Sequence, residues 1–232
     1  MGNLRLRQVV LLTGDLTGSL AAARAAFGFT GGVRDEPGMA ELGFAHEVYT
    51  FGDTFLEICA PLSADSPHGR LVAEGDLGYM AVVQVGDLAG VVGRAAEQGI
   101  EPVLHQDYGG HPISQWHPKA LGTLAEIDEI DPPETWHFAP EIFEHRSTGV
   151  ATDIVGAAIA VDDPTAMARR WADLLGLEAA GTRVRLGSEQ LDFVETGGGR
   201  RGLRSVDVLA ADPARAGDTL TLCGVDFHFV AG

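Results

Sequence analysis

The chain has 232 residues, enough for one large domain or two small ones, and its 45% hydrophobic and 21% charged residues are typical of globular proteins. Its formal net charge of −17 argues against nucleic-acid and anionic-membrane partners, because both favour basic patches. No apolar run is long enough to span a bilayer, and the first residues enter strand-like sequence without a signal-peptide cleavage region, so we expect a cytoplasmic location.

One phrase recurs along the chain: an apolar strand, an Asp, a helix and a Gly. The first three copies place the helix at residues 19–27, 89–98 and 165–175. The distance from Asp to Gly is 13, 12 and 13 residues in these copies, which indicates internal repetition. In the third copy, Asp163 suits the N-cap of its helix and Gly176 suits the left-handed position after the helix. A fourth, eroded copy begins at 205–210 and has little helix.

Short strand-like segments follow each helix, so each copy is predicted to form a βαβββ unit. We expect these strands at 39–44, 46–51 and 55–60 in the first copy, and at 102–106, 113–117 and 123–127 in the second. The third copy keeps an abbreviated pair at 183–186 and 190–195. The sequence thus predicts an α+β protein with a two-unit domain at 4–131, a linker at 132–149 and a degenerate second pair of units at 150–232.

A single acid interrupts the last strand of the first unit. Side chains alternate along a strand, so Phe55, Glu57 and Cys59 are predicted to share one face, opposite Leu56 and Ile58. A carboxylate in such a run is costly unless it is solvated, hydrogen-bonded or bound to metal. The second unit repeats the pattern at Glu126, and the third has Asp192 there.

The linker between the second and third copies contains three prolines and three aromatic residues over positions 131–145. This composition argues against regular structure. It suits either a lid on a pocket or a strap that packs onto the domains, and the aromatic residues favour the strap.

Paired βαβββ units with an acid in each last strand resemble the vicinal oxygen chelate superfamily, which includes glyoxalase I, methylmalonyl-CoA epimerase, extradiol dioxygenases and antibiotic-binding resistance proteins. Within it, the chain looks like bacterial glyoxalase-like proteins. The segments that carry the resemblance are RQVVL (7–11), GDTFLE (52–57), GYM and VGDL (78–80 and 85–88), HPK (117–119) and LCGVDFHFV (222–230). It implies that two units curl into a cup-shaped sheet, but the fold hosts unrelated reactions.

The resemblance also implies a site built from the first and last strand of each unit. The equivalent positions in this chain are Gln8, Glu57, Met80 and Glu126. Three of them suit a divalent metal such as Zn, Ni, Co, Mn or Fe, whereas the Met80 thioether is a poor ligand for such ions. His46 or His117 is then a candidate for the missing ligand. The later units have Gly156 and Ser205 at the first-strand positions and are predicted to hold no metal.

Two classes of function follow. As an enzyme, the protein would be a lyase or isomerase that transfers a proton beside a carbonyl or thioester, with Glu57 and Glu126 as catalytic carboxylates, with or without metal. As a binding protein, it would sequester a small molecule in an apolar cup. The predicted ligand-binding residues are Phe55, Tyr79, Met80, Trp116 and His117. The sequence leaves open whether the protein is an enzyme, whether the two acids are merely hydrogen-bonded, and whether the chain forms a homodimer.

Overall fold

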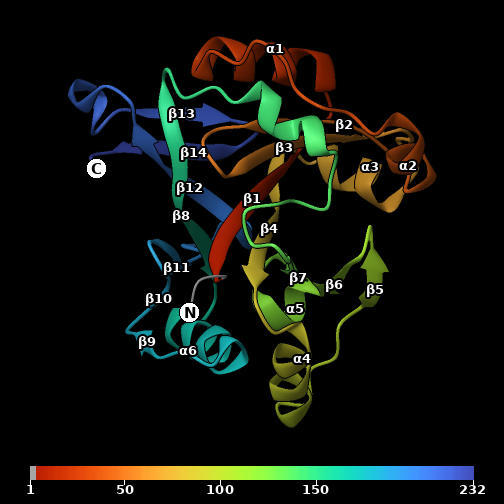
Figure 1. The fold of residues 1–232 in the computed structure, drawn as a ribbon, viewed down its shortest axis with the longest axis vertical. Helices are drawn as coiled ribbons and strands as arrows, with labels where there is room; N and C mark the ends of the chain where they lie inside the picture. The colour runs from red at the N-terminus through yellow and green to blue at the C-terminus, as the bar shows by residue number, and fades with distance from the viewer. Residues whose placement is uncertain (1–3) are drawn as a thin grey trace. The chain divides into compact units, whose positions relative to one another are not determined.

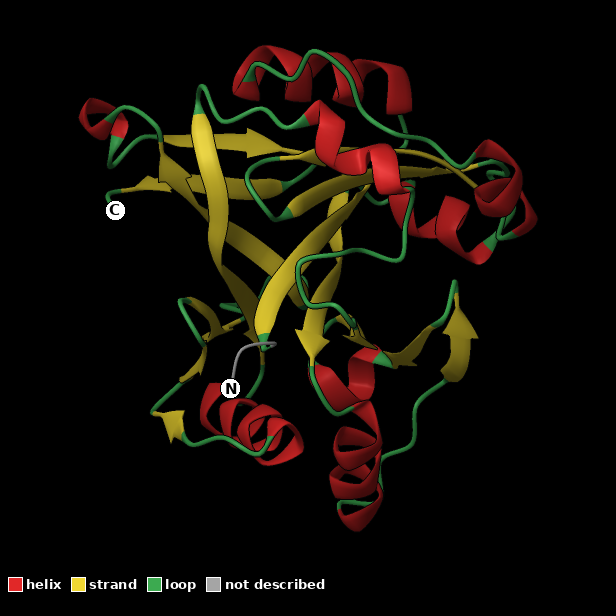
Figure 2. Cartoon of the chain, viewed as in Figure 1, coloured by secondary structure: helices red, strands yellow, loops and turns green. Residues whose placement is uncertain are grey.

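A computed structural model describes residues 4–232 as an α+β fold made of four successive modules (Figures 1 and 2). The first module contains β1 (Arg5–Leu12), α1 (Leu16–Phe27), α2 (Glu36–Glu41), β2 (Phe44–Thr50) and β3 (Phe55–Pro61), and α3 (Pro67–Val72) follows it. The second contains β4 (Leu77–Val85), α4 (Leu88–Glu97), β5 (Leu104–Tyr108), β6 (His111–Trp116), α5 (Pro118–Leu121) and β7 (Leu124–Glu129). The 3-10 helix η1 (Pro140–His145) lies in the linker.

The later modules are shorter. The third contains β8 (Ala151–Val161), α6 (Pro164–Leu175), β9 (Ala179–Ala180), β10 (Arg183–Leu186) and β11 (Glu189–Glu195). The fourth contains β12 (Gly202–Ala210), the 3-10 helix η2 (Pro213–Arg215), β13 (Thr219–Leu222) and β14 (Val225–Val230). The predicted α+β class and the repeated βαβββ-type unit are therefore confirmed.

The chain forms two compact units that are interleaved in sequence. The 1/4 unit combines the first and fourth modules and comprises residues 8–79, 141–154 and 205–232. The 2/3 unit combines the second and third modules and comprises residues 4–7, 80–140 and 155–204. A border between the two units falls inside the first strand of every module. The compact units therefore do not consist of modules that are consecutive pairs from the start of the chain. The predicted division at 4–131, 132–149 and 150–232 stays a prediction about repeat boundaries.

Within each module the last strand pairs in parallel with the first. This pairing joins β3 to β1, β7 to β4, β11 to β8 and β14 to β12. The remaining strands then add in antiparallel order. This arrangement places the equivalent first-strand and last-strand positions of a module on neighbouring strands, and it fixes the faces on which Gln8, Glu57, Met80 and Glu126 lie.

The strand predicted at 39–44 is wrong. Residues 36–41 instead form α2, because the Asp35 carboxylate caps the helix through the backbone N–H of Gly38 and Pro37 suits the first turn. A single antiparallel bridge between Val33 and Val48 stands where a further strand would lie beside β2. The first module therefore has two strands after its main helix rather than three.

The predicted helix signals are confirmed where the three main helices begin. Asp15, Asp87 and Asp163 each accept a hydrogen bond from a backbone N–H in the first turn. Gly28 and Gly176 then adopt the left-handed conformation, with φ of 71° and 69°, which a residue with a side chain adopts at a cost.

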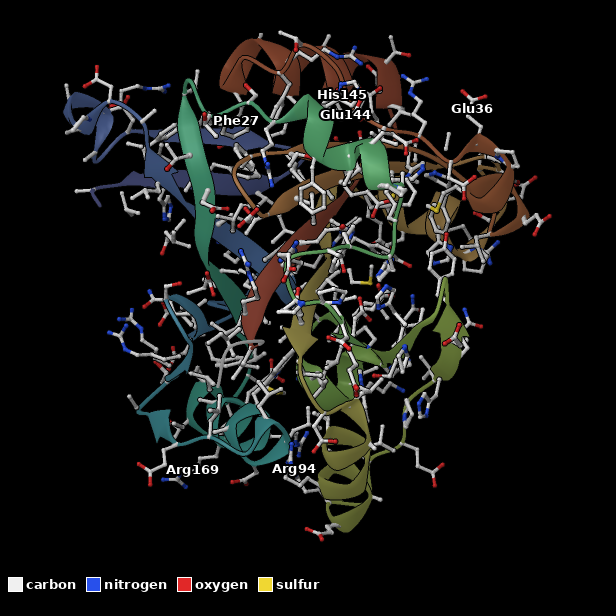
Figure 3. All side chains as sticks on the ribbon, viewed as in Figure 1. Phe27, Glu36, Arg94, Glu144, His145 and Arg169 are labelled. Atoms are coloured by element: carbon white, nitrogen blue, oxygen red, sulfur yellow. The ribbon has the colours of Figure 1, made fainter. Side chains whose placement is uncertain are left out.

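An aromatic cluster forms the centre of the 1/4 unit. The ring of Phe27, at the end of α1, lies 5.2 Å from the rings of Phe51 and Phe227 and 5.6 Å from that of Phe29. Figure 3 labels Phe27. The cluster joins the first module to the fourth, although about 200 residues separate Phe27 from Phe227.

In the 2/3 unit, α4 lies beside α6 (Figure 1). Arg94, labelled in Figure 3, donates from Nε to the backbone oxygen of Leu174 over 2.9 Å. Trp171 is fully buried and donates from Nε1 to the backbone oxygen of Leu121 at 3.0 Å. Trp171, Leu174 and Leu175 are all buried.

The aromatic linker packs its apolar side chains, as a strap would. Trp136 is buried in the 2/3 unit, and Ile142 is fully buried in the 1/4 unit. The Thr50 hydroxyl donates to the backbone oxygen of Ile142 at 2.8 Å, which fixes η1 to the end of β2. Across residues 4–232, every helix is too short or too polar to cross a membrane.

Candidate functional site

The three strands of the first module expose one face on which the predicted residues gather. Register pairs Gln8 with Phe55 between β1 and β3, and it pairs His46 with Cys59 and Val48 with Glu57 between β2 and β3. Side chains alternate along each strand, so Gln8, His46, Phe55, Glu57 and Cys59 share a face. The predicted facing of Phe55, Glu57 and Cys59 is therefore confirmed by the contacts described next.

The Glu57 carboxylate accepts hydrogen bonds from three side chains. Gln8 Nε2 lies 2.7 Å from Oε2, His46 Nδ1 lies 2.6 Å from Oε1, and Cys59 Sγ lies 3.2 Å from Oε1. The side chain of Glu57 is 10% exposed, and that of His46 is 2% exposed. Donors on both carboxylate oxygens stabilise the ionised form in a buried position.

The tautomer of His46 follows from its second contact. The backbone N–H of Asp35 donates to Nε2 of His46 at 2.8 Å, so this nitrogen carries the lone pair. The ring proton must then lie on Nδ1, where it points at Glu57. The turn that begins α2 thus decides which proton His46 presents to the carboxylate. Nothing in the spacing of His46 and Glu57 revealed this contact, because Asp35 contributes only its backbone.

Aromatic side chains border this face. The Phe143 ring of η1 lies 5.7 Å from the ring of Phe55. Tyr79 Oη lies 3.0 Å from Nε2 of His68, and the His68 ring lies 4.7 Å from that of Phe44. Burial raises the pKa of Tyr79 to about 12, with further contributions from Cys59 and Glu57. Burial also raises the pKa of the Cys59 thiol and lowers that of the His68 imidazole. Tyr79 and Cys59 are therefore protonated and His68 neutral at pH 7.

The opposite face of the same strands carries another buried acid, Glu47. Arg24 Nη2 and Arg34 Nη2 lie 2.5 Å and 2.7 Å from its two oxygens. Burial alone would raise the pKa of Glu47, but the hydrogen bonds from Arg34 and Arg24 outweigh it and lower the pKa. Glu47 is thus paired with cations under α1, whereas Glu57 is held by neutral donors.

The 2/3 unit holds the equivalent face of the second module. Register pairs Met80 with Leu124, Val82 with Glu126 and Gln84 with Asp128, so these side chains share one face. Gln115 of β6 lies opposite Glu126 and donates from Nε2 to its Oε2 at 2.6 Å. Met80 and Glu126 are both buried. Because Gln8 and Glu57 belong to the 1/4 unit, the convergence of all four residues on one cavity stays a prediction.

Two side chains that could bind a metal lie beside Glu126. His137 Nε2 lies 3.0 Å from Oδ2 of Asp128, and the potential metal-binding atoms of Glu126, Asp128 and His137 all lie within 4.8 Å of one another. Burial raises the pKa of Asp128 well above its usual range, although a hydrogen bond with Glu126 opposes this. Asp128 stands two residues after Glu126 on the same face, so strand alternation could have identified it. The position of His137 in the linker gave no such signal.

Two of the predicted ligand-binding residues are placed elsewhere. Trp116 pairs with Ala125, so its ring lies on the face opposite Glu126, where it is fully buried and donates to Ser114 Oγ at 2.8 Å. His117 is exposed and caps α5 by accepting from the backbone N–H of Lys119. Neighbouring residues of a strand point to opposite faces of the sheet, so Gln115 lies on the face of Glu126 and Trp116 lies on the other face.

The resemblance implies a divalent metal, and His46, Glu57 and Cys59 do bring donor atoms within 4.8 Å of one another. The protonation of His46 argues against binding there. A metal ligand needs a lone pair, but Nδ1 carries a proton and Nε2 is occupied by the N–H of Asp35. Of the predicted metal ligands Gln8, Glu57, Glu126 and His46, the three in the 1/4 unit (Gln8, Glu57 and His46) therefore do not fit a metal ion in this arrangement.

Comparison with known proteins finds a structural likeness without a sequence match. Neither a protein family nor a curated protein matches the chain. A 4-hydroxymandelate synthase variant from Streptomyces coelicolor superimposes with a TM-score of 0.68 at 12% identity, over 91% of this chain and 72% of that one. Methylmalonyl-CoA epimerase from Mycobacterium tuberculosis gives a TM-score of 0.46 at 21% identity, over 55% of this chain and 88% of that one.

Both proteins belong to the vicinal oxygen chelate superfamily, and identities this low speak to the fold alone. The likeness to the synthase covers all four modules, and each module of this chain has the pairing of first and last strand described above. The chain therefore has the fold of the vicinal oxygen chelate superfamily.

Proposed function

We propose that the protein is a metal-independent isomerase- or lyase-type enzyme in which Glu57 moves a proton beside the carbonyl or thioester of a small molecule. The observation that supports this most directly is the Glu57 carboxylate itself, held by three neutral donors on a buried face and still 10% exposed. A buried carboxylate without a paired cation is expensive to maintain, and active sites are where such costs recur.

The three donors give Glu57 the properties of a general base. They fix the direction of the carboxylate, and a hydrogen bond to a charged group contributes about 1.5–3 kcal/mol. His46 is itself fixed by Asp35, so the orientation does not depend on a mobile side chain. Fixed groups need no reorganisation when charge moves in the transition state.

The reaction balances with Glu57 alone as base. The C–H bond next to the carbonyl breaks, the proton forms an O–H bond with Glu57, and the electron pair moves onto the carbonyl oxygen to give an enolate. Return of the proton to the same carbon restores the substrate with solvent hydrogen exchanged into it. In a hydroxyaldehyde, return of the proton to the former carbonyl carbon, with the hydroxyl proton moving to the other oxygen, gives an isomer. Loss of a leaving group from the neighbouring carbon gives a lyase product.

The Tyr79 hydroxyl is our candidate for stabilising the enolate oxygen. Its pKa of about 12 keeps it protonated, and it lies beside His68, which is neutral. When His68 carries its proton on Nε2, it donates to Tyr79, whose own proton is then available to the carbonyl oxygen. Donors aimed at a developing oxyanion supply a large share of many rate enhancements.

Glu126 stays a predicted second catalytic carboxylate. A glutamine amide donates to each acid, but Gln115 does so from β6, whereas Gln8 donates from β1, the strand equivalent to β4. We therefore test both acids separately.

The test is hydrogen exchange in D₂O. Small 2-oxo acids, hydroxyaldehydes and short acyl thioesters are incubated with the purified protein, and mass spectrometry follows deuterium at the carbon beside the carbonyl. We expect exchange with one class, a loss of more than about 100-fold in Glu57→Gln, and no change in Glu41→Gln, which alters an exposed acid on α2. Absence of exchange with every class, or equal exchange in Glu57→Gln, would refute the proposal. Glu126→Gln is measured in parallel to decide whether the second acid takes part.

The aromatic border favours a second candidate, a non-catalytic protein that binds a small molecule. Phe44, Phe55, His68 and Tyr79 supply the ring faces such a site uses. Thermal stabilisation by a compound that shows no exchange would support this function instead.

A further inference from the structure

We propose that Glu126, Asp128 and His137, together with the side-chain oxygen of Gln84, bind a divalent transition-metal ion. The site lies beneath the part of the linker that belongs to the 2/3 unit, residues 132–140, which we call the strap. This site shares Glu126 with the predicted metal set of Gln8, Glu57, Glu126 and His46, but its other three ligands are new. It does not depend on the proton transfer proposed for Glu57. It uses residues of one unit only.

The donor atoms are already gathered. Donor atoms of Glu126, Asp128 and His137 lie within 4.8 Å of one another. Three ligand atoms that share one zinc ion lie about 3.4–3.6 Å apart, since Zn–N and Zn–O distances are about 2.1 Å. The three groups would therefore contact one ion after their side chains close by up to about 1.4 Å.

Two buried oxygens could serve as ligands of a cation. Within the described chain, Asp128 Oδ1 and Gln84 Oε1 have no hydrogen-bond partner, and both residues are fully buried. Gln84 and Asp128 are register partners on neighbouring strands, so the two oxygens arise from adjacent positions on the same face. Buried acceptors without a donor are rare and costly, and an ion between them would satisfy both.

The surroundings hold the ligands in place. Gln84 Nε2 donates to the backbone oxygen of Pro133 at 2.8 Å, which fixes residue 133 to β4. The same hydrogen bond orients the amide, so its oxygen Oε1 is the atom left to bind an ion. The His137 ring stacks on Trp136 at 4.4 Å and meets the edge of Tyr108 at 5.3 Å. Gln115 orients Glu126. Such outer contacts are typical of bound metal ligands.

The chemistry of the four ligands limits which metal ions can bind. Two carboxylates and an amide oxygen are hard donors, and the imidazole is a borderline donor that Mg²⁺ and Ca²⁺ seldom use. Mn²⁺, Fe²⁺, Co²⁺ and Zn²⁺ accept this mixture. His137, with 10% of its side chain exposed, is the most accessible member and marks the side from which an ion enters.

The test uses the full chain stripped with EDTA and titrated with Mn²⁺, followed by electron paramagnetic resonance, and with Co²⁺, followed by visible absorption. We expect one equivalent of ion to bind and the melting temperature to rise. Asp128→Asn and His137→Gln should each weaken binding more than about tenfold, because each removes a ligand. Glu134→Gln, an exposed acid on the strap, and Glu57→Gln should bind as the wild type does.

The competing explanation is a proton shared between Asp128 and Gln84. It predicts that wild-type protein binds no equivalent of either ion, and that Asp128→Asn melts higher whether or not metal is present, because its amide donates to Gln84. Either that result or undiminished binding in Asp128→Asn would overturn the proposal. The wild-type titration decides even if a variant fails to fold. Loss of exchange in Glu57→Gln tests the proposed function separately, since that variant keeps the metal ligands.

Discussion

His46 Nδ1 lies 2.6 Å from Glu57 Oε1, and the backbone N–H of Asp35 determines that this nitrogen carries the proton. The contact links the start of α2 to an acid in the middle of β3. His46 therefore acts on any chemistry at this face through Glu57 and is a positioning residue.

Replacing His46 by Ala should slow exchange without abolishing it. The change removes the donor that lies 2.6 Å from Oε1, so the Glu57 carboxylate loses one of the three groups that fix its direction. We expect a rate loss of about 10- to 100-fold at pH 7. His46→Gln, which can restore a donor, should recover part of this rate. A purely structural role would leave His46→Ala and His46→Gln equally slow.

Glu47 should control stability in acid. Its folded pKa is lowered below the unfolded value of about 4.3, so its contribution is fully present above that pH and is lost as pH falls through the folded pKa. Arg24 and Arg34 are 41% and 44% exposed, which weakens these ion pairs by solvent screening. We expect Glu47→Gln to cost about 1–3 kcal/mol in urea unfolding at pH 7.

The same comparison at falling pH provides the control for Glu47. The stability difference between wild type and Glu47→Gln should shrink as pH falls through the folded pKa of Glu47, because the wild-type carboxylate becomes protonated. A difference that stays constant as pH falls would mean that packing, rather than charge, explains the effect.

Strand alternation predicted the shared face of Phe55, Glu57 and Cys59. The superfamily resemblance, applied through the repeat spacing, put Gln8 with Glu57 and Met80 with Glu126, because register on neighbouring parallel strands follows from equivalent positions in a repeat. The functional roles of these residues stay predictions. Alternation and resemblance did not predict the tautomer of His46, since a backbone N–H has no signature in sequence. They misplaced Trp116, whose side chain belongs to the other face by one residue.

The interleaving of the two units was also beyond the sequence. The repeat predicts which segments are alike but not which copies pack together. Contacts such as that between Phe27 and Phe227 join the first module to the fourth, and Arg94 joins the second to the third through Leu174. Such long-range packing depends on side-chain shape, which short periodic patterns do not encode.

The linker should contribute to stability mainly through Ile142. This side chain is fully buried and its backbone oxygen accepts from Thr50, whereas Phe143 is only half-buried against Phe55. We expect Ile142→Ala to cost about 2–4 kcal/mol and Phe143→Ala about 1–2 kcal/mol in urea unfolding. The reverse order would show that Phe143 is the anchor of the linker. Phe143→Ala should also expose the linker to limited proteolysis.

Replacing Tyr79 by Phe separates catalysis from binding at the Glu57 face. The change removes one hydroxyl and its contact with His68 at 3.0 Å but keeps the ring beside Phe44. His68 is half-buried and can turn to water, so unfolding should change by no more than about 1 kcal/mol. If Tyr79 donates to an enolate oxygen, kcat for exchange should fall about 100-fold while KM changes little, because the hydrogen bond strengthens only as charge develops. The measurement is steady-state exchange at several substrate concentrations, with His68→Ala as the matched variant that keeps the hydroxyl. An unchanged kcat in Tyr79→Phe would remove the tyrosine from the chemistry, and weaker ligand binding with no other effect would assign it to the wall of a binding site.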